Sequence, residues 1–206
     1  MASSKSKQSQ IAEIVKCGKD PVYFMNKYLK IQHPLRGLIP FKTYPFQNDC
    51  VKEFNDHRFN IVLKSRQLGL STLVAAYAVW QAVFYKEKNI LIIATKLAVA
   101  QNFIRKVKTY IKSMPNWLLV PMITANNKQQ VEFSNGSQIK AVPTSEDAGR
   151  SEALSLLIVD EAAFVRNFDE LWMGLYPTLS TGGRAILLST PNGVGGQYHE
   201  IYIKAL

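Results

Sequence analysis

The chain has 206 residues, of which 47% are hydrophobic and 19% are charged, enough to bury one sizeable core. Its two cysteines are too few for a disulfide framework. We see no secretory leader and no apolar run of the roughly 18 residues that a membrane span needs, so a reducing cytoplasm is the expected compartment. The formal net charge of +10 favours an anionic partner, but charge alone does not separate DNA from RNA or a nucleotide.

Composition divides the chain into three parts. Residues 1–10 are rich in Ser, Lys and Gln and have too little apolar content to fold by themselves, so they are expected to form a flexible arm. Residues 11–43 mix apolar and basic side chains, with Pro21 and Pro34 among them, which predicts short helices in a lid-like segment beside the main core. Residues 44–206 are expected to form that core.

The core begins with a strand, a loop, a helix and a second strand. Asn60–Lys64 reads as a buried strand, Thr72–Tyr85 as a helix and Asn89–Thr95 as a strand rich in β-branched residues. Apolar residues then recur at helical spacing from Phe103 to Met114, and Pro115 ends that helix. This alternation is typical of parallel α/β units.

More strands follow. Val131–Phe133 and Gln138–Val142 flank a Ser-Asn-Gly-Ser turn, in which Asn-Gly supplies positive φ angles, so they predict a β-hairpin insertion. Leu156–Val159 and Ala185–Leu188 are two further apolar runs, each followed by polar residues. The predicted fold class is therefore α/β, with a central, mainly parallel sheet flanked by helices.

The segment between the first strand and its helix is similar to a phosphate-binding loop. In the pattern G-x-x-x-x-G-K-[ST], backbone N–H groups hold phosphate, the lysine reaches the β- and γ-phosphates, and the hydroxyl residue binds magnesium. Gly69 and Ser71 fit, but Leu70 replaces the lysine and Lys64 stands where the first glycine belongs. A glycine turn of this kind also occurs purely for packing. The candidate binding residues are Ser65, Arg66, Gln67, Leu68, Gly69, Leu70, Ser71 and Thr72.

A second motif strengthens the case for nucleotide binding. Leu156–Val159 leads directly into Asp160 and Glu161, which the sheet would place near the loop at its carboxyl edge. This pattern resembles a Walker B motif. Asp160 and Ser71 are the candidate magnesium ligands, and Glu161 is the candidate group that polarises the attacking water. The structural alternative is a strand end capped by solvated acids.

From Tyr44 to Tyr198 the sequence resembles the ATPase domain of phage terminase large subunits, the DNA-packaging motors, most closely those of T-even-type phages. The resemblance rests on Ser65–Gly69, Asp160–Phe164 and Ser189–Gly193, in this order and spacing. It implies a P-loop NTPase of the additional-strand, catalytic-glutamate type, whose hydrolysis of ATP with magnesium drives double-stranded DNA into a procapsid. Residues 44–206 would then be the ATPase core.

The resemblance also implies roles for individual residues. Gln47, in Tyr-Pro-Phe-Gln, matches the adenine-recognition segment, and a glutamine amide can pair with both edges of adenine. Arg66 matches an arginine that senses the γ-phosphate. Arg150 resembles the arginine finger that one subunit offers to its neighbour. Ser189 and Thr190 match the motif that couples hydrolysis to movement of DNA.

The missing lysine is the main departure from the family pattern. Leucine cannot neutralise phosphate, and losing one preorganised charge costs roughly 3–4 kcal/mol of transition-state stabilisation. We therefore hypothesise that Lys64 reaches over the loop to the β- and γ-phosphates in place of Leu70. The alternative is that Arg66 compensates alone.

The family resemblance further implies partners and a location. It implies double-stranded DNA, a portal protein, a small terminase subunit and a homo-oligomeric ring, commonly of five subunits, with a monomer allowed in isolation. The expected location is the host cytoplasm at the portal vertex of the procapsid and not the mature virion, with no membrane contact. Because the chain ends at Leu206 without a second acidic cluster, no C-terminal nuclease domain and no DNA cleavage are expected.

Two points stay open on the sequence alone. The basic residues Arg105, Lys106, Lys108 and Lys112 of one predicted helix could contact DNA phosphates, or they could be a solvated face. The competing functions are a helicase-like nucleic-acid translocase, which usually needs a second motor domain, and a non-catalytic nucleotide-binding module, which Leu70 allows.

Overall fold

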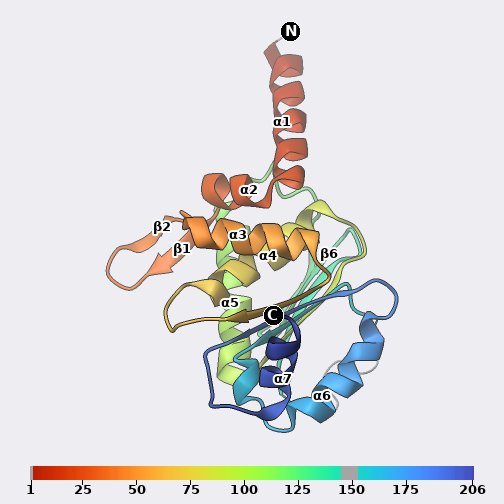
Figure 1. Cartoon of the computed structure of the whole chain (residues 1–206). Helices are drawn as coiled ribbons and strands as arrows, with labels where there is room; N and C mark the ends of the chain where they lie inside the picture. The colour runs from red at the N-terminus through yellow and green to blue at the C-terminus, as the bar shows by residue number, and fades with distance from the viewer. Residues whose placement is uncertain (1, 145–152) are drawn as a thin grey trace.

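A seven-stranded sheet with helices on both faces forms the centre of the molecule in the computed structural model, which describes residues 2–144 and 153–206 (Figure 1). The sheet order is β3-β9-β8-β4-β7-β6-β5. Its strands are β3 (Phe59–Leu63), β4 (Asn89–Ala94), β5 (Ile123–Asn126), β6 (Gln130–Phe133), β7 (Gln138–Pro143), β8 (Leu156–Asp160) and β9 (Arg184–Ser189).

Five strands, from β3 to β7 in the sheet order, are parallel, and β6 and β5 extend the sheet antiparallel. The predicted mainly parallel α/β class is thus confirmed. Strand β9 lies between β3 and β8, so the strand before the candidate phosphate loop and the strand before Asp160 are not neighbours. Both strands still end at the same edge of the sheet, which brings the loop and the carboxylates together.

The central strands are buried on both faces, as expected for parallel strands covered by helices. In β8, Leu156 and Ile158 pack in one hydrophobic cluster, while Leu157 and Val159 pack in the other. This alternation follows from the two-residue period of a strand. The sheet is therefore held from both sides, and its carboxyl edge is a rigid base for a site.

Helices α4 (Leu70–Phe84) and α5 (Leu97–Ser113) contribute to the first cluster. Helix α4 is apolar almost all round and is the central buried helix of the domain. The opposite face is covered by η1 (Ala162–Phe164), α6 (Phe168–Leu175), η2 (Tyr176–Leu179) and α7 (Gly196–Lys204).

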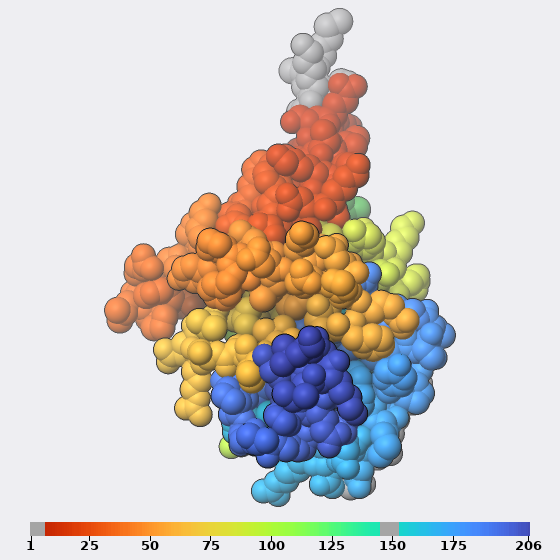
Figure 2. Space-filling view, in the orientation of Figure 1, coloured from red at the N-terminus to blue at the C-terminus, as the bar shows by residue number. Residues whose placement is uncertain are grey.

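The N-terminal part packs on α4 through its own helices. It consists of α1 (Ala2–Lys19), α2 (Pro21–Tyr28), a two-stranded hairpin of β1 (Lys30–His33) and β2 (Gly37–Pro40), and α3 (Pro45–Asp56). The indole N–H of Trp80 donates to the Cys17 carbonyl at 2.9 Å and so ties α4 to α1. Figure 2 shows α1 projecting from the rounded body, with α3 lying across the top.

Two features of this part were not predicted. Residues 2–10 have helical backbone continuous with α1, since Ala, Lys and Gln are good helix formers. Whether this arm is mobile stays a prediction. The β1–β2 hairpin was not predicted, because its strands are only four residues long and Pro34 and Arg36 interrupt the alternating pattern between them. Its turn has a positive φ of 67° at Gly37.

The predicted hairpin at β6–β7 is present, but it is part of the main sheet, because β7 pairs in parallel with β4. Only Gly136 of its Asn-Gly pair has a positive φ, at 79°, and its N–H bonds the Phe133 carbonyl. The turn is therefore a longer one that ends in a glycine, not a two-residue turn with positive φ at both positions. Separately, no helix among the described residues is long and apolar enough to cross a membrane.

Gly183 offers a test of this fold because it precedes β9 at a point of close backbone approach. A Cβ at this position would lie 2.2 Å from the Leu154 carbonyl oxygen. Gly183→Ala is expected to lower the free energy of unfolding by about 2–3 kcal/mol, measured by urea denaturation. Gly18→Ala is the control, since its Cβ would sit at an ordinary 3.5 Å from Phe84. Equal stability of the two variants would contradict the packing described here.

Candidate nucleotide site

The loop between β3 and α4 is fixed at both ends. The Lys64 N–H donates to the Ser189 carbonyl of β9 at 2.9 Å, so the loop leaves the sheet at the carboxyl edge. Gly69 caps α4 with a φ of 71°, and its carbonyl accepts from the N–H groups of Thr72 and Leu73. Gln67 also has a positive φ, of 63°. The helix N-terminus thus directs its dipole and N–H groups toward the place where an anion would sit.

Gln47 holds this loop from α3. Its side chain is 2% exposed; the amide nitrogen donates to the Leu68 carbonyl at 2.9 Å, and the amide oxygen accepts from the Tyr44 N–H at 3.1 Å. A Cβ on Gly69 would lie 2.9 Å from this amide nitrogen. Gln47 therefore positions the loop, a role the sequence did not indicate, while adenine recognition by Gln47 stays a prediction. Tyr44 and Phe46 stack on each other nearby, at 5.8 Å.

Leu70 does not face the loop's concave side. It is 3% exposed and packs in the hydrophobic cluster that also contains the buried apolar residues of α4. A lysine at this position would have to leave the core to reach a phosphate. The leucine is thus a packing residue, and the charge that the family pattern places here must come from elsewhere.

The Lys64 side chain lies against Glu161. Its ammonium is 2.6 Å from Oε1 of Glu161, and the lysine side chain is only 7% exposed, against 32% for the glutamate. The pair bridges the start of the loop and the end of β8. The fold therefore brings together two residues that are 97 positions apart in sequence.

Glu161 is held in a fixed orientation by its backbone and by Thr190. It has a left-handed conformation, with φ 54° and ψ 46°, which is uncommon for glutamate. Its Oε2 accepts from both the N–H and the hydroxyl of Thr190, each at 3.1 Å. Burial alone would raise the pKa of Glu161, but hydrogen bonds from Lys64 and Thr190 lower it below its ordinary value. Glu161 is therefore a carboxylate at neutral pH.

Asp160 and Ser71 form the second half of the site. The Ser71 hydroxyl donates to Oδ2 of Asp160 at 2.9 Å, while Oδ1 of Asp160 is buried without a hydrogen-bond partner among the described residues. Burial raises the pKa of Asp160, opposed chiefly by the charge of Lys64. An unpaired carboxylate oxygen next to a serine hydroxyl fits a hard cation such as magnesium, which takes few protein oxygens and completes its shell with water and phosphate.

Ser189 ends β9 beside this pair. It is fully buried; its hydroxyl donates to the Thr190 carbonyl at 2.8 Å and accepts from the Ala163 N–H at 3.1 Å. The Asn192 amide donates to the Ala163 carbonyl at 2.8 Å. The end of β9 is thus bonded both to Glu161 and to the turn that follows it.

The other candidate residues are less constrained. Ser65, Arg66, Gln67 and Leu68 are exposed in the loop, and Thr72 lies in the first turn of α4. Arg150 lies outside the described residues, so its predicted role is not addressed by the structure. The basic residues of α5 do not act alike: the Lys108 ammonium donates to the Asn127 carbonyl at 2.7 Å, and Lys112 is exposed.

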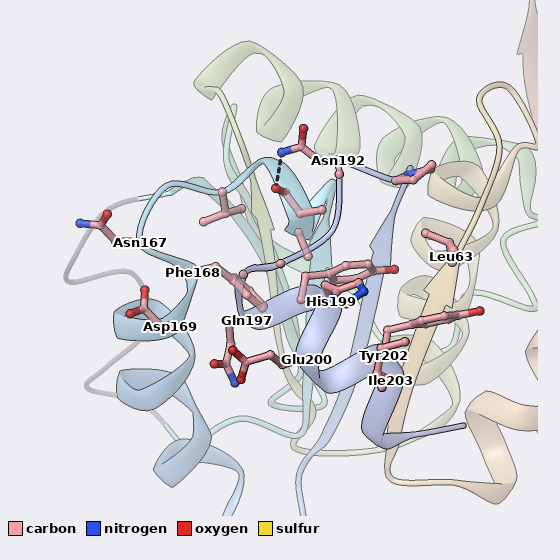
Figure 3. A pocket seen from close by; sticks show the side chains of 18 residues that line it. Leu63, Asn167, Phe168, Asp169, Asn192, Gln197, His199, Glu200, Tyr202 and Ile203 are labelled. Atoms are coloured by element: carbon pink, nitrogen blue, oxygen red, sulfur yellow. Dashed lines mark hydrogen bonds between the residues drawn. The ribbon is translucent and has the colours of Figure 1, made fainter.

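A cavity of about 610 Å³ lies next to the site, between α7, the loop after β9 and the start of α6 (Figure 3). Asn192 points toward the turn after Glu161, and His199 and Tyr202 project from α7 on the other side. Tyr198 of α7 donates its hydroxyl to the Val62 carbonyl at 2.9 Å. The cavity contains no residue of the 64–72 loop, so we do not assign it to phosphate.

The strand order, the loop at the N-terminus of α4 and the paired carboxylates define a P-loop NTPase fold of the additional-strand type. Residues 61–206 match the family described as terminase large subunit, T4likevirus-type, N-terminal. The chain belongs to this family. The resemblance inferred from the sequence motifs is thereby confirmed.

Solved structures agree with this fold. The large terminase of bacteriophage HK97 is similar with a TM-score of 0.73 and 18% identity, over 91% of this chain and 40% of that one. The ATPase domain of the Thermus phage P74-26 large terminase, as an arginine-to-alanine mutant, gives a TM-score of 0.68 and 18% identity, over 79% and 70% of the two chains. The large terminase of a thermophilic bacteriophage in complex with ADP gives 0.55 and 17%, over 74% and 38%. This chain thus spans less than half of the HK97 protein and of the ADP-bound protein.

The Lys64–Glu161 pair predicts a pH-dependent coupling. In a double-mutant cycle with Lys64→Met and Glu161→Gln, urea denaturation at neutral pH is expected to give a coupling energy of roughly 1–3 kcal/mol. Because folding lowers the pKa of Glu161, its contribution is present above the ordinary carboxyl range and is lost as pH falls through the folded-state pKa. The coupling should therefore vanish in acid.

Lys112→Met, which removes an exposed lysine, is the control and should show no coupling to Glu161→Gln. A coupling energy that is zero at neutral pH, or unchanged in acid, would show that the contact seen here contributes nothing as an ion pair.

Proposed function

We propose that this chain is the ATPase motor domain of a viral terminase large subunit, which hydrolyses ATP to translocate double-stranded DNA into a procapsid. The observation that carries this proposal is the arrangement at the carboxyl edge of the sheet. There the Glu161 carboxylate is held by Lys64 and Thr190 beside the Ser71–Asp160 pair. A protein that only bound nucleotide would have little use for an oriented, ionised carboxylate at this place.

Phosphate binding falls to the loop and to Lys64. The triphosphate would lie along the loop at the N-terminus of α4, where backbone N–H groups and the helix dipole stabilise negative charge. Lys64 is a cation already held in place at the start of the loop, whereas Leu70 is in the core. We propose that its ammonium exchanges Glu161 for a γ-phosphate oxygen when ATP binds, which releases Glu161 to act on water. Arg66, exposed in the same loop, would add a second contact.

Magnesium would be held by Asp160 and Ser71, with phosphate oxygens and water completing its shell. When bound, the ion supplies positive charge that neutralises the transferring phosphoryl group. Asp160 would need no large rearrangement to bind the ion. Among the described residues its Oδ1 has no hydrogen-bond partner, and its Oδ2 already accepts a hydrogen bond from the Ser71 hydroxyl.

Glu161 would act on the attacking water. Its carboxylate accepts a hydrogen bond from the water and takes the proton as the water oxygen bonds to the γ-phosphorus. The bond from that phosphorus to the β–γ bridging oxygen breaks, and ADP leaves. Before ATP binds, hydrogen bonds from Lys64 and Thr190 lower the pKa of Glu161, so the group enters this step as a carboxylate.

Thr190 would link a movement of Glu161 to a movement of the segment between β9 and α7. It is the residue through which β9 bonds Glu161, and it is followed by a segment in which Gly193, Gly195 and Gly196 all have positive φ. A shift of Glu161 on phosphate binding would break the Thr190 bonds and free that segment to move α7. This supports the coupling role proposed for Ser189 and Thr190.

The remaining assignments follow from the family and concern the assembled motor. We propose double-stranded DNA as the polymer, with a portal protein and a small terminase subunit as partners and a homo-oligomeric ring at the portal vertex as the working form. Arg150 would complete the site of a neighbouring subunit in that ring. The net charge of +10 suits a partner with a phosphate backbone.

Two substitutions separate hydrolysis from binding. Glu161→Gln should reduce the rate of phosphate release at least about 100-fold while ATP still binds, because only the proton acceptor is lost. Lys64→Ala should reduce the rate by roughly 100- to 1,000-fold and weaken ATP binding as well, because a phosphate contact is lost. Steady-state phosphate release and equilibrium ATP binding measure both.

The control is Leu70→Lys, which restores the family's lysine at a position that faces the core. It should not rescue Lys64→Ala. An unchanged rate in Lys64→Ala together with a large gain in Leu70→Lys would contradict the proposed role of Lys64.

A further inference from the structure

Two basic residues of α5, Arg105 and Lys106, line a groove that also contains Thr72, and of these two only Lys106 is half-buried. On the same helix, Lys108 donates a hydrogen bond to a backbone carbonyl, and Lys112 is exposed. Lys106 is half-buried, and the negative charge of Asp160 acts on its ammonium. The sequence grouped these residues as one basic face. The structure separates Lys106 from Lys108 and Lys112, because these positions on the helix point in different directions.

Lys106 lines a groove of about 480 Å³ beside the phosphate loop. The β1–β2 hairpin borders it on one side and α5 on the other, and the two lie on the same side of the molecule in Figure 1. Thr72, from the first turn of α4, is also in its wall. Its polar lining consists chiefly of Gln32, Thr72, Asn102, Arg105, Lys106 and Thr109.

A buried tyrosine fixes the distance between Lys106 and the loop. Tyr110, one helical turn after Lys106, donates its hydroxyl to the Thr72 carbonyl at 3.0 Å. Its ring is 1% exposed and stacks on Phe41 at 6.2 Å. Helix α5 is thereby held against the first turn of α4, and the backbone that carries Lys106 is held with it.

Among the residues that the structure describes, no counter-charge contacts Lys106 directly. Among residues 2–144 and 153–206 it makes no hydrogen bond or ion pair, and the Asp160 charge acts on it only from a distance. Its ammonium lies 5.3 Å from the centre of the Phe103 ring, a contact that supplies no anion. Burial accordingly lowers the pKa of Lys106. A half-buried ammonium without a counter-charge is unfavourable unless a ligand supplies one.

We infer that Lys106 binds a phosphate group of the nucleotide from the α5 side of the loop. This inference rests on the proposed function and adds to it a second cation that supports Lys64. Lys64 approaches from β3 and Lys106 from α5, so the two ammonium groups would flank the triphosphate. The charge that Leu70 does not provide is thus shared by two residues outside the family's lysine position.

The test is the affinity for ATP and ADP, with magnesium, of the wild-type chain, Lys106→Gln, Lys106→Arg and Lys112→Gln, measured by isothermal titration calorimetry. Lys106→Gln should raise the Kd for ATP about tenfold, and Lys106→Arg should stay within about threefold of wild type, because the charge is kept. Lys112→Gln makes the same change of net charge on the same helix and should shift the Kd less than about twofold. Thermal unfolding checks that each variant is folded.

The outcomes distinguish this inference from the function on which it rests. If wild type binds no ATP, both fail. If wild type binds ATP and Lys106→Gln binds it equally well, only the role of Lys106 is overturned. A further arm measures binding to duplex DNA. Equal losses of DNA affinity in Lys106→Gln and Lys112→Gln, with ATP binding unchanged, would make Lys106 a DNA contact and would likewise overturn the inference.

Discussion

The ion pair between Lys64 and Glu161 is the interaction on which the site depends. It joins the start of the phosphate loop to the end of β8, and its lysine is almost fully buried. A buried charge needs a partner of opposite sign, so Lys64 must contact either Glu161 or another anion placed close by. Because position 70 is a leucine, the cation at this place is Lys64, and its burial requires that an anion always be bound to it. Lys64, the cation that would bind phosphate, is also the residue that holds Glu161 in place.

The sheet topology makes this pairing possible. Strand β9 lies between β3 and β8, and its end supplies Ser189 and Thr190 to both neighbours. The Ser189 carbonyl accepts from the Lys64 N–H, while Thr190 bonds the Glu161 carboxylate. The end of β9 is therefore hydrogen-bonded to both residues of the ion pair. A change in the Lys64–Glu161 contact would therefore alter the hydrogen bonds at the end of β9. It would also alter the position of the glycine-containing segment that leads from β9 to α7.

Much of this could be predicted from the sequence because the signals are local. The strands, the glycine loop and the Asp160–Glu161 pair follow from residue type and period, and the expected parallel sheet is confirmed. The expectation that the first strand is buried was wrong, because β3 lies at the edge of the sheet and its residues are half-buried or exposed. What could not be predicted depends on side-chain direction. Leu70 packs in the core, Gln47 bonds the loop backbone through its amide, and Lys106 lines a groove that Lys108 and Lys112 do not. The β1–β2 hairpin was not predicted because a proline and a charged residue interrupt its alternating pattern.

Exchange of Glu161 for phosphate by Lys64 is the step on which the proposed mechanism depends. The most direct measurement is a crystal structure of this chain with magnesium and a non-hydrolysable ATP analogue. We predict that the Lys64 ammonium contacts a γ-phosphate oxygen and that Glu161 is released to face the position of the attacking water. A γ-phosphate held by other cations, with Lys64 still bonded to Glu161, would contradict this mechanism.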